Sequence, residues 1–327
     1  MILEVRDLKV GFGQGADRRD AVDGVSFDVA EGEFFLVIGE SGSGKSLTGG
    51  AIVGLNPPGA TVSGSVRFKG RELIGQSERV LRRVRGGEIG IVYQNPLGAM
   101  NPVWPVGDQI AESLRVHGRA DGRRAAIRAV ELLERVHIPD PGRVAGAYPH
   151  EISGGMRQRA VIAMALACDP SLLIADEPTT ALDVTVKAQV LDLLAELRQD
   201  LNLSVMLITH DMGVVAQLAD RVLVMYAGRV AETGPAEAIL SIPAHPYTEA
   251  LMLSGGMADA PFKALLQAIP GSAPLLEARP PGCRFNPRCP RAEDDCRGVV
   301  PKLRPVQSTV AACHHPLGLA VPAGCAA

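Results

Sequence analysis

One glycine-rich stretch constrains this chain more than any other part of its sequence. It runs Gly39-Glu40-Ser41-Gly42-Ser43-Gly44-Lys45-Ser46, after the apolar run 34–38 and before a proline-free segment, 47–55. A strand, a glycine-rich turn and a helix in this order form a loop whose backbone N–H groups surround phosphates, and the helix adds its positive N-terminal end. Lys45 is then placed to reach the β- and γ-phosphates of a nucleotide, and Ser46 to hold Mg²⁺. The alternative, a turn that matches by accident, does not account for the flanking strand and helix.

Composition limits the classes of protein to consider. The chain has 327 residues, of which 46% are apolar, enough for one large domain or two modest ones with a substantial core. Its formal charge of -3 and pI of about 6.2 give no excess of positive charge, which argues against nucleic acid as a partner. No apolar run reaches the roughly 18 residues that a membrane span needs, and no export signal opens the sequence. We therefore expect a globular protein that is neither exported nor inserted in a membrane.

Hydrophobic periodicity predicts a layered α/β fold. Residues 1–38 alternate apolar and polar positions around a polar loop at 11–20, which predicts an antiparallel β-layer leading into the phosphate loop. Residues 96–158 are expected to form an inserted helical subdomain, and its arginines, interrupted by acids, favour a solvated face over a binding patch. Further strands are predicted at 62–68, 88–93, 171–177, 203–209, 221–226 and 229–232. Helices are predicted at 152–168 and 184–200, and the segment 106–136 is expected to be mainly helical.

Polar side chains follow three of the predicted strands. Gln94 follows the strand at 88–93, Asp176 and Glu177 end the next, and His210 follows the strand at 203–209. Two acids after an apolar run are costly unless a cation or water chemistry uses them. Asp176 would face Mg²⁺, and Glu177 would orient the attacking water or accept its proton. A satisfied structural residue is the alternative for His210, but it is expected at the same edge of the sheet as Lys45.

Two more features have both a functional and a structural interpretation. Phe12 precedes the polar loop and could stack on an adenine ring, or simply pack. The segment Ser153-Gly154-Gly155 opens a helix, for which Ser153 is a good N-cap. Its alternative use is to bind an anion with the serine hydroxyl and the free N–H groups of the helix start.

In order and spacing, these motifs resemble the ATPase subunit of an ABC transporter across residues 1–240. The resemblance implies an ABC-type P-loop ATPase: a RecA-like α/β core with an antiparallel β-layer and the inserted helical subdomain. It implies catalytic roles for Glu177, His210 and Gln94, and Mg²⁺ contacts for Ser46, Gln94 and Asp176. The residues expected to bind ATP are Phe12, Gly39, Ser41, Gly42, Ser43, Gly44, Lys45, Ser46, Leu47, Gln94, Ser153, Gly154, Gly155, Asp176 and Asp183.

Within that family, Ala244-His245-Pro246-Tyr247 and the segment 282–290 resemble the oligopeptide/dipeptide importer branch, which also includes nickel importers. In the family, each ATP lies between the phosphate loop of one subunit and the Ser-Gly-Gly helix of another. Since this chain has one such loop, we expect a second ATPase subunit, a related but non-identical chain. Two membrane permease subunits would contact residues 94–105, and an external substrate-binding protein would act through them. The chain would then lie on the cytoplasmic face of the membrane as a peripheral subunit.

Other classes are possible from the residues alone. A nickel or other small-solute importer of the same branch would carry the same motifs. A soluble ABC-type ATPase acting on ribosomes or DNA would need two nucleotide domains, a coiled-coil insertion or a basic face, none of which is visible. An inactive regulatory partner would not need Glu177 and His210.

The proline-rich extension, 241–327, carries four cysteines: Cys283, Cys289, Cys296 and Cys313. Their spacing lacks the C-x2-C pairs of common zinc and ferredoxin sites, so it leaves zinc, a four-iron cluster and a metal-free state open, and His314 or His315 could replace one thiolate. Disulfides are less expected in an ATP-using protein without an export signal. In resembling peptide-importer subunits the cysteines bind a 4Fe-4S cluster. The resemblance therefore favours that cluster over zinc, as a staple for a segment with little core of its own.

Overall fold

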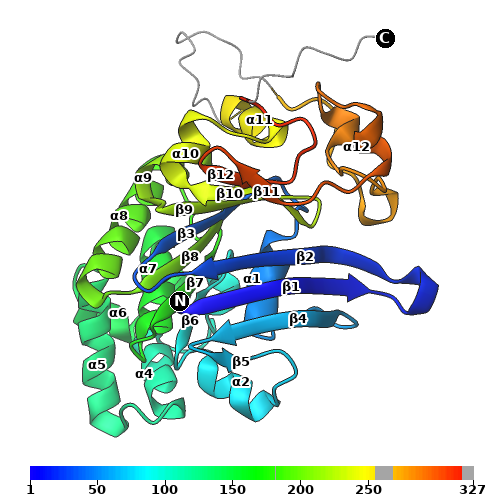
Figure 1. Cartoon of the computed structure of the whole chain (residues 1–327). Helices are drawn as coiled ribbons and strands as arrows, with labels where there is room; N and C mark the ends of the chain where they lie inside the picture. The colour runs from blue at the N-terminus through cyan, green and yellow to red at the C-terminus, as the bar shows by residue number, and fades with distance from the viewer. Residues whose placement is uncertain (181, 255–267, 319–327) are drawn as a thin grey trace, which may run out of the picture.

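The computed structural model describes residues 1–180, 182–254 and 268–318 (Figure 1). Its strands are β1 Leu3–Phe12, β2 Arg19–Val29, β3 Phe34–Ile38, β4 Thr61–Phe68, β5 Arg71–Glu72, β6 Ile89–Val92, β7 Leu172–Asp176, β8 Ser204–Thr209, β9 Arg221–Tyr226, β10 Arg229–Pro235, β11 Arg304–Val306 and β12 Thr309–Ala311. Its α-helices are α1 Lys45–Ile52, α2 Glu78–Val84, α3 Pro96–Ala99, α4 Val106–Val116, α5 Gly122–Arg135, α6 Pro141–Gly146, α7 Gly154–Leu166, α8 Val184–Leu201, α9 Met212–Leu218, α10 Ala236–Ser241, α11 Pro246–Ser254 and α12 Asp294–Gly298. Four 3-10 turns occur at Gly15–Asp17, Pro149–Glu151, Leu276–Ala278 and Asn286–Arg288. In the described part of the chain, no helix combines the length and the apolar character that a bilayer crossing requires.

An eight-stranded sheet forms the centre of the molecule, in the order β11-β12-β10-β9-β3-β8-β7-β6. The five strands from β9 to β6 are parallel to one another, and β10 pairs with β9 in the antiparallel direction. Every residue of β3 and β8 is buried, as expected of continuous apolar runs in a parallel sheet that is covered on both faces. Their carboxyl ends therefore meet at one edge, where the polar residues that follow them are brought together.

A second sheet, ordered β2-β1-β4-β5, is antiparallel and supplies the predicted β-layer. One apolar core joins its inner face to α1 and to one face of the central sheet. Phe27 of β2 and Phe35 of β3 stack across this core with ring centroids 5.2 Å apart. The layer thereby fixes α1, and with it the phosphate loop, against the central sheet (Figure 1).

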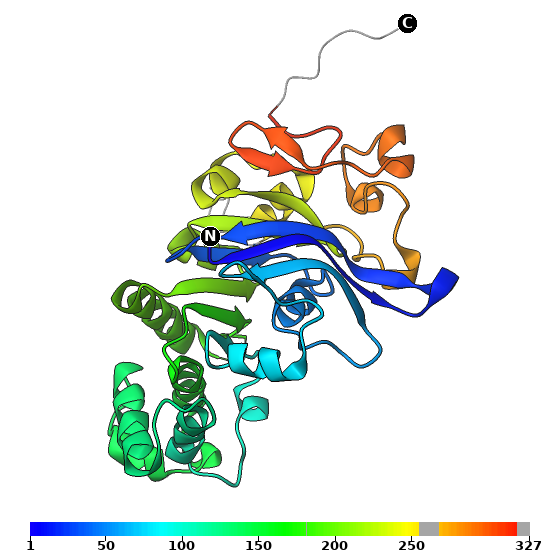
Figure 2. The same cartoon turned by 60° about the horizontal axis from the view of Figure 1, so that its bottom comes forward.

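The inserted helices gather at one end of the molecule, away from the C-terminal extension (Figure 2). The expectation that 106–136 is mainly helical is confirmed, and the segment forms two helices, α4 and α5. Gly118 has a φ of 64° after the end of α4, a conformation that glycine adopts without steric cost and that cannot continue a helix. The break lets α4 and α5 pack against each other and against α7, which starts at the Ser-Gly-Gly segment.

The C-terminal extension is continuous with the central sheet. Strand β12 pairs with β10, with Glu232 opposite Ala311. Glu232 is fully buried, and its carboxylate accepts hydrogen bonds from the Ala244 and His245 N–H groups and the Thr309 hydroxyl, at 2.8 to 2.9 Å. Residues on both sides of position 240 thus share one sheet and one core.

Candidate active site

A polar cavity lies at the carboxyl edge of the parallel strands, where the sequence predicts a nucleotide site. Lys45 begins α1, Gln94 follows β6, and Glu177 follows β7, so three separate segments reach one place. This confirms the predicted convergence of Lys45, Gln94 and Glu177. The lining residues are Ala21, Ser41, Gly42, Ser43, Gly44, Lys45, Ser46, Leu47, Gln94, Glu177 and Arg279.

The phosphate loop depends on glycine at two positions. Gly39 has a φ of 152°, and a Cβ there would lie 2.2 Å from the Met225 carbonyl oxygen. Gly44, with a φ of 99°, is the residue before α1. Lys45 is 4% exposed, and its Nζ donates to the carbonyl oxygens of Gly39 and Glu40 at 2.7 and 2.9 Å. Burial lowers the pKa of Lys45, and the charges of three nearby carboxylates oppose that change: Glu177, Asp176 and Glu40.

Ser46 and Asp176 form a pair of oxygen donors beside the loop. The Ser46 hydroxyl donates to Asp176 Oδ1 at 3.0 Å. Burial raises the pKa of Asp176, and the hydrogen bond from Ser46 acts in the opposite direction. A hydroxyl and a carboxylate are the hard oxygen ligands that Mg²⁺ prefers, so these residues fit the predicted ion.

Glu177 is the centre of a second polar group. Its Oε2 accepts from Gln94 Nε2 at 3.1 Å and from the Thr180 hydroxyl at 2.7 Å, while its Oε1 lies 3.3 Å from His210 Nδ1. Burial raises the pKa of Glu177, but the bonds from Thr180 and His210 outweigh it, so that the pKa of Glu177 is lowered. The side chain is therefore a carboxylate at neutral pH and can accept a hydrogen bond from water.

The backbone also fixes Glu177. Its φ of 46° lies in the left-handed region, which costs about 1 kcal/mol for a residue other than glycine. Sequence reasoning missed Thr180, whose hydroxyl donates to the Glu177 carboxylate from three positions further along the chain. It also missed Arg279, which comes from the extension and donates to the Asp20 and Ala21 carbonyl oxygens at 2.6 and 3.1 Å.

Other predicted site residues lie outside this cavity. Phe12 ends β1 opposite Arg19 and is partly buried. Ser153 caps α7, where its Oγ accepts from the Met156 N–H at 3.2 Å, and Asp183 caps α8 by accepting from the Val186 N–H at 2.9 Å. The two helix starts are in close contact, because a Cβ on Gly155 would lie 2.6 Å from a Val186 methyl carbon. Gly154 belongs to the same first turn of α7, partly exposed.

The four cysteines of the extension approach one another. The Cys283 N–H donates to the Cys296 carbonyl oxygen at 2.8 Å, and Cys313 follows β12. Burial raises the pKa of Cys313 to about 12, with smaller contributions in the same direction from the charges of the other three thiols, including Cys289. The structure thus brings together four residues that are spread over 31 positions of the sequence, from 283 to 313.

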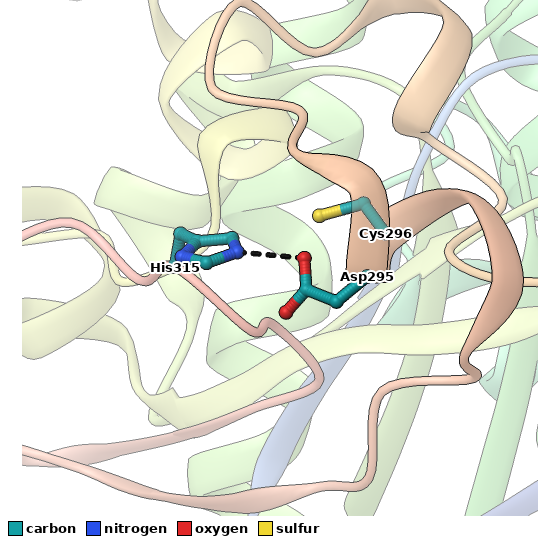
Figure 3. Close-up of side chains that lie close together, drawn as sticks. All are labelled: Asp295, Cys296 and His315. Atoms are coloured by element: carbon teal, nitrogen blue, oxygen red, sulfur yellow. Dashed lines mark hydrogen bonds and ion pairs between the residues drawn. The ribbon is translucent and has the colours of Figure 1, made fainter. Parts of the chain in front are cut away.

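Two side chains beside Cys296 complete this region (Figure 3). His315 Nε2 lies 2.8 Å from Asp295 Oδ1, and ligand atoms of Asp295, Cys296 and His315 all lie within 4.8 Å of one another. This is the only such group of three or more in the described part of the chain, so no three of its cysteine sulfurs are that close. Zn–S bonds of about 2.3 Å would bring tetrahedral ligands within about 4 Å of each other. The sulfurs are therefore spaced more widely than one zinc ion requires.

Known proteins share these features. Residues 22–180 match the family described as "ABC transporter", and residues 231–296 match "Oligopeptide/dipeptide transporter, C-terminal region". The chain is 46% identical to the dipeptide transport ATP-binding protein DppD of Escherichia coli K12, over 97% of each chain. It belongs to the ATP-binding proteins of the oligopeptide/dipeptide ABC transporter family. As predicted for this family, the core is an ABC cassette of mixed α/β sheets.

The chain is also similar to another transport ATP-binding protein and to two ATP-binding cassettes of known structure. The chain is 51% identical to the oligopeptide transport ATP-binding protein OppD of Mycobacterium bovis over 92% of its own length, and it spans about half the length of that relative, 50%. A dimeric ATP-binding cassette, solved in a post-hydrolysis state bound to ADP and Pi, matches 72% of this chain and 98% of its own with a TM-score of 0.64 and 28% identity. The cassette cbiO1 of Clostridium perfringens, part of an ABC transporter complex, matches 73% of this chain and 90% of its own, with a TM-score of 0.63 and 28% identity.

Proposed function

We propose that this chain binds and hydrolyses ATP to power the import of di- or oligopeptides. The observation that carries the proposal is the convergence of Lys45, the Ser46–Asp176 pair and the Glu177–His210 pair at one edge of the sheet. Relatives that match the whole chain are named as dipeptide transport ATP-binding proteins. Family membership thus supports the cargo class, and the cavity supports the chemistry.

The side chains at the carboxyl edge of the sheet have different roles in binding and hydrolysing ATP. Lys45 exchanges its two carbonyl partners for phosphate oxygens of the nucleotide. Ser46 and Asp176 hold Mg²⁺, which neutralises charge on the phosphates when it is bound. Glu177 orients the attacking water through its carboxylate, while His210 holds that carboxylate in place. Gln94 hydrogen-bonds the same carboxylate from the segment that leads to the inserted helices.

A second ATPase subunit would complete the site. The start of α7, at Ser153 to Gly155, is not part of the cavity at the phosphate loop of its own chain, and its N–H groups suit a phosphate of another subunit. A solved relative at 28% identity is described as dimeric. We expect a related, non-identical chain in this place, with the caps at Ser153 and Asp183 holding both helix starts in position.

The membrane partners would contact an apolar surface near Gln94. Tyr93, Val103 and Trp104 are 46%, 71% and 42% exposed, so three large apolar side chains lie on the surface within a dozen residues of Gln94 in the sequence. Tyr93 also lines a hollow together with Ser46, Leu47, Leu55, Asn56 and Pro57. Two permease subunits would bind here on the cytoplasmic face of the membrane, and an external substrate-binding protein would deliver the peptide to them.

We also propose that the ring of Phe12 stacks on the adenine ring of the bound nucleotide.

Glu177→Gln tests the proposal. ATP binding should survive, and phosphate release should fall by a factor of about 100 or more, because an amide replaces the group that orients the water. Glu112→Gln, which neutralises an exposed acid of α4, is the matched control and should hydrolyse at the wild-type rate. Unchanged hydrolysis in Glu177→Gln would remove Glu177 from this role.

We also propose a 4Fe-4S cluster at Cys283, Cys289, Cys296 and Cys313. The support is the convergence of the four thiols and a sulfur spacing wider than a zinc site. Protein purified without oxygen should be brown and contain iron and sulfide. Cys283→Ser should lose both, whereas Cys168→Ser, two residues after α7 and outside the extension, should keep them. A colourless protein that contains one zinc ion would reject the cluster.

A further inference from the structure

The phosphate loop of this chain contains an acid. Glu40 lies between Gly39 and Ser41, so its negative charge is next to the place where a triphosphate would bind. An unopposed carboxylate at this position would repel the nucleotide, and the repulsion would be strong because the site is partly shielded from water. Something in the protein has to neutralise Glu40 for the loop to serve an anion.

Arg288 supplies that charge from the C-terminal extension. Its two terminal nitrogens donate to the two carboxylate oxygens of Glu40 at 2.6 and 2.9 Å, a bidentate pair. The arginine side chain is 5% exposed and the Glu40 side chain 27%. Arg288 is itself held by the Pro270 carbonyl oxygen at 2.8 Å and by the Tyr226 hydroxyl at 3.2 Å. The guanidinium is therefore fixed before any nucleotide arrives.

The backbone of Glu40 is held by the same extension. Its N–H donates to the hydroxyl of Tyr247, on α11, at 2.8 Å, and its carbonyl oxygen accepts from Lys45 Nζ at 2.9 Å. One loop residue thus connects two side chains of the extension to the lysine that serves the phosphates.

The Arg288–Glu40 pair also faces the catalytic carboxylate. A cavity on this side of the loop is lined by Gly39, Glu40, Ser41, Gln94, Glu177, His210, Leu251, Ser254, Ala268, Ile269, Gly271 and Arg288. The extension therefore forms one wall of the space in which the proposed chemistry takes place.

We infer that Arg288 is a positioning residue for the nucleotide site, which neutralises Glu40 and holds the first half of the phosphate loop in its binding conformation. This inference rests on the proposed function, since it assigns a role in ATP binding to the extension. It predicts that the acid and the arginine are energetically coupled: the acid harms binding only when the arginine is missing.

The test is a double-mutant cycle on the full chain, with the dissociation constant of Mg-ATP as the readout. Arg288→Met, which keeps much of the side-chain length, should weaken ATP binding about tenfold or more, because it leaves the Glu40 charge unopposed. Glu40→Gln with Arg288→Met should restore binding to within about threefold of wild type. In the hydrolysing protein, Arg288→Met should raise KM and change kcat little.

Arg284→Met is the matched control, because Arg284 belongs to the same extension and pairs with Asp23 instead of the loop. It removes a buried ion pair of the same kind and should leave ATP binding unchanged. Unchanged binding in Arg288→Met, or failure of Glu40→Gln to rescue it in protein whose circular dichroism is native, would overturn the inference. If Arg288→Met does not fold, Glu40→Gln alone decides: it should bind ATP at least as tightly as wild type, and weaker binding would overturn the inference. Because binding is measured directly, a wild-type protein that binds ATP without hydrolysing it would refute the proposed function and leave this test intact.

Discussion

Asp176 and Glu232 are both acids on strands of the central sheet, but the protein uses them in opposite ways. Asp176, at the nucleotide site, has a single hydroxyl donor, and burial raises its pKa. Glu232, under the extension, is fully buried and receives three hydrogen bonds from the protein itself. The first acid is left incomplete for a ligand to satisfy, while the second is complete and ties the extension to the core. The free energy of unfolding should therefore depend on Glu232 and be diminished by Asp176.

Glu232→Ala should have the largest effect on stability. It leaves the N–H groups of Ala244 and His245 buried without the acceptor that they have in the wild type, leaves the Thr309 hydroxyl with the more distant Val306 carbonyl oxygen at 3.3 Å, and opens a small cavity. We expect a loss of about 4 kcal/mol in the free energy of unfolding, measured by urea denaturation. Glu237→Ala, an exposed acid on α10, is the control and should change stability by less than about 0.5 kcal/mol. Equal losses in the two variants would contradict the role given to Glu232.

Acid should loosen the same junction through His245. Burial lowers its pKa from 6.5 to about 4, and its Nδ1 accepts the Tyr247 N–H at 3.0 Å, which requires the neutral ring. Because the pKa of His245 is higher in the unfolded chain, protonation favours unfolding. The contribution of the neutral His245 to stability is therefore complete above about pH 6.5 and is lost as the pH falls toward 4. Over that range the histidine should account for about 3 kcal/mol. His245→Asn keeps an acceptor for the Tyr247 N–H and should remove this part of the pH dependence; an unchanged profile would exclude His245 as its source.

The nucleotide edge could be predicted from the sequence because its residues follow the strands that position them. Gln94, Glu177 and His210 follow the apolar runs of β6, β7 and β8, Lys45 follows the loop after β3, and parallel strands end at a common edge. Local pattern and sheet geometry together determine where such side chains lie. The same logic predicted the β-layer and the helices around the central sheet, but not the break at Gly118, which divides one apolar periodicity into two helices.

The contacts of the extension could not be predicted in this way. Arg288 and Glu40 are 248 positions apart, and Thr309 and Glu232 are 77 apart. Nothing local to either partner indicates the other, since an arginine in a proline-rich loop is ordinarily solvated. The pairing of β12 with β10 brings Thr309 to Glu232, while contacts with Pro270 and Tyr226 hold Arg288 beside Glu40. The position of Phe12 relative to the base likewise depends on how the β-layer meets a nucleotide.

Asp176→Asn should change the free energy of unfolding least among these tests, and it should raise it instead of lowering it. The amide removes a partly buried charge and keeps an oxygen that can accept from Ser46 Oγ, so the nucleotide-free protein should gain about 1 kcal/mol of stability. Because the folded pKa of Asp176 is raised, the wild-type acid costs stability as the pH rises through that pKa, and this cost should be absent from the variant. With Mg-ATP present the wild type should be the more stable of the two proteins, because the amide is a poor ligand for Mg²⁺. The rise in melting temperature that Mg-ATP causes should therefore be smaller in the variant. A variant less stable than wild type without nucleotide would show that Asp176, like Glu232, is held for the fold and not for the ligand.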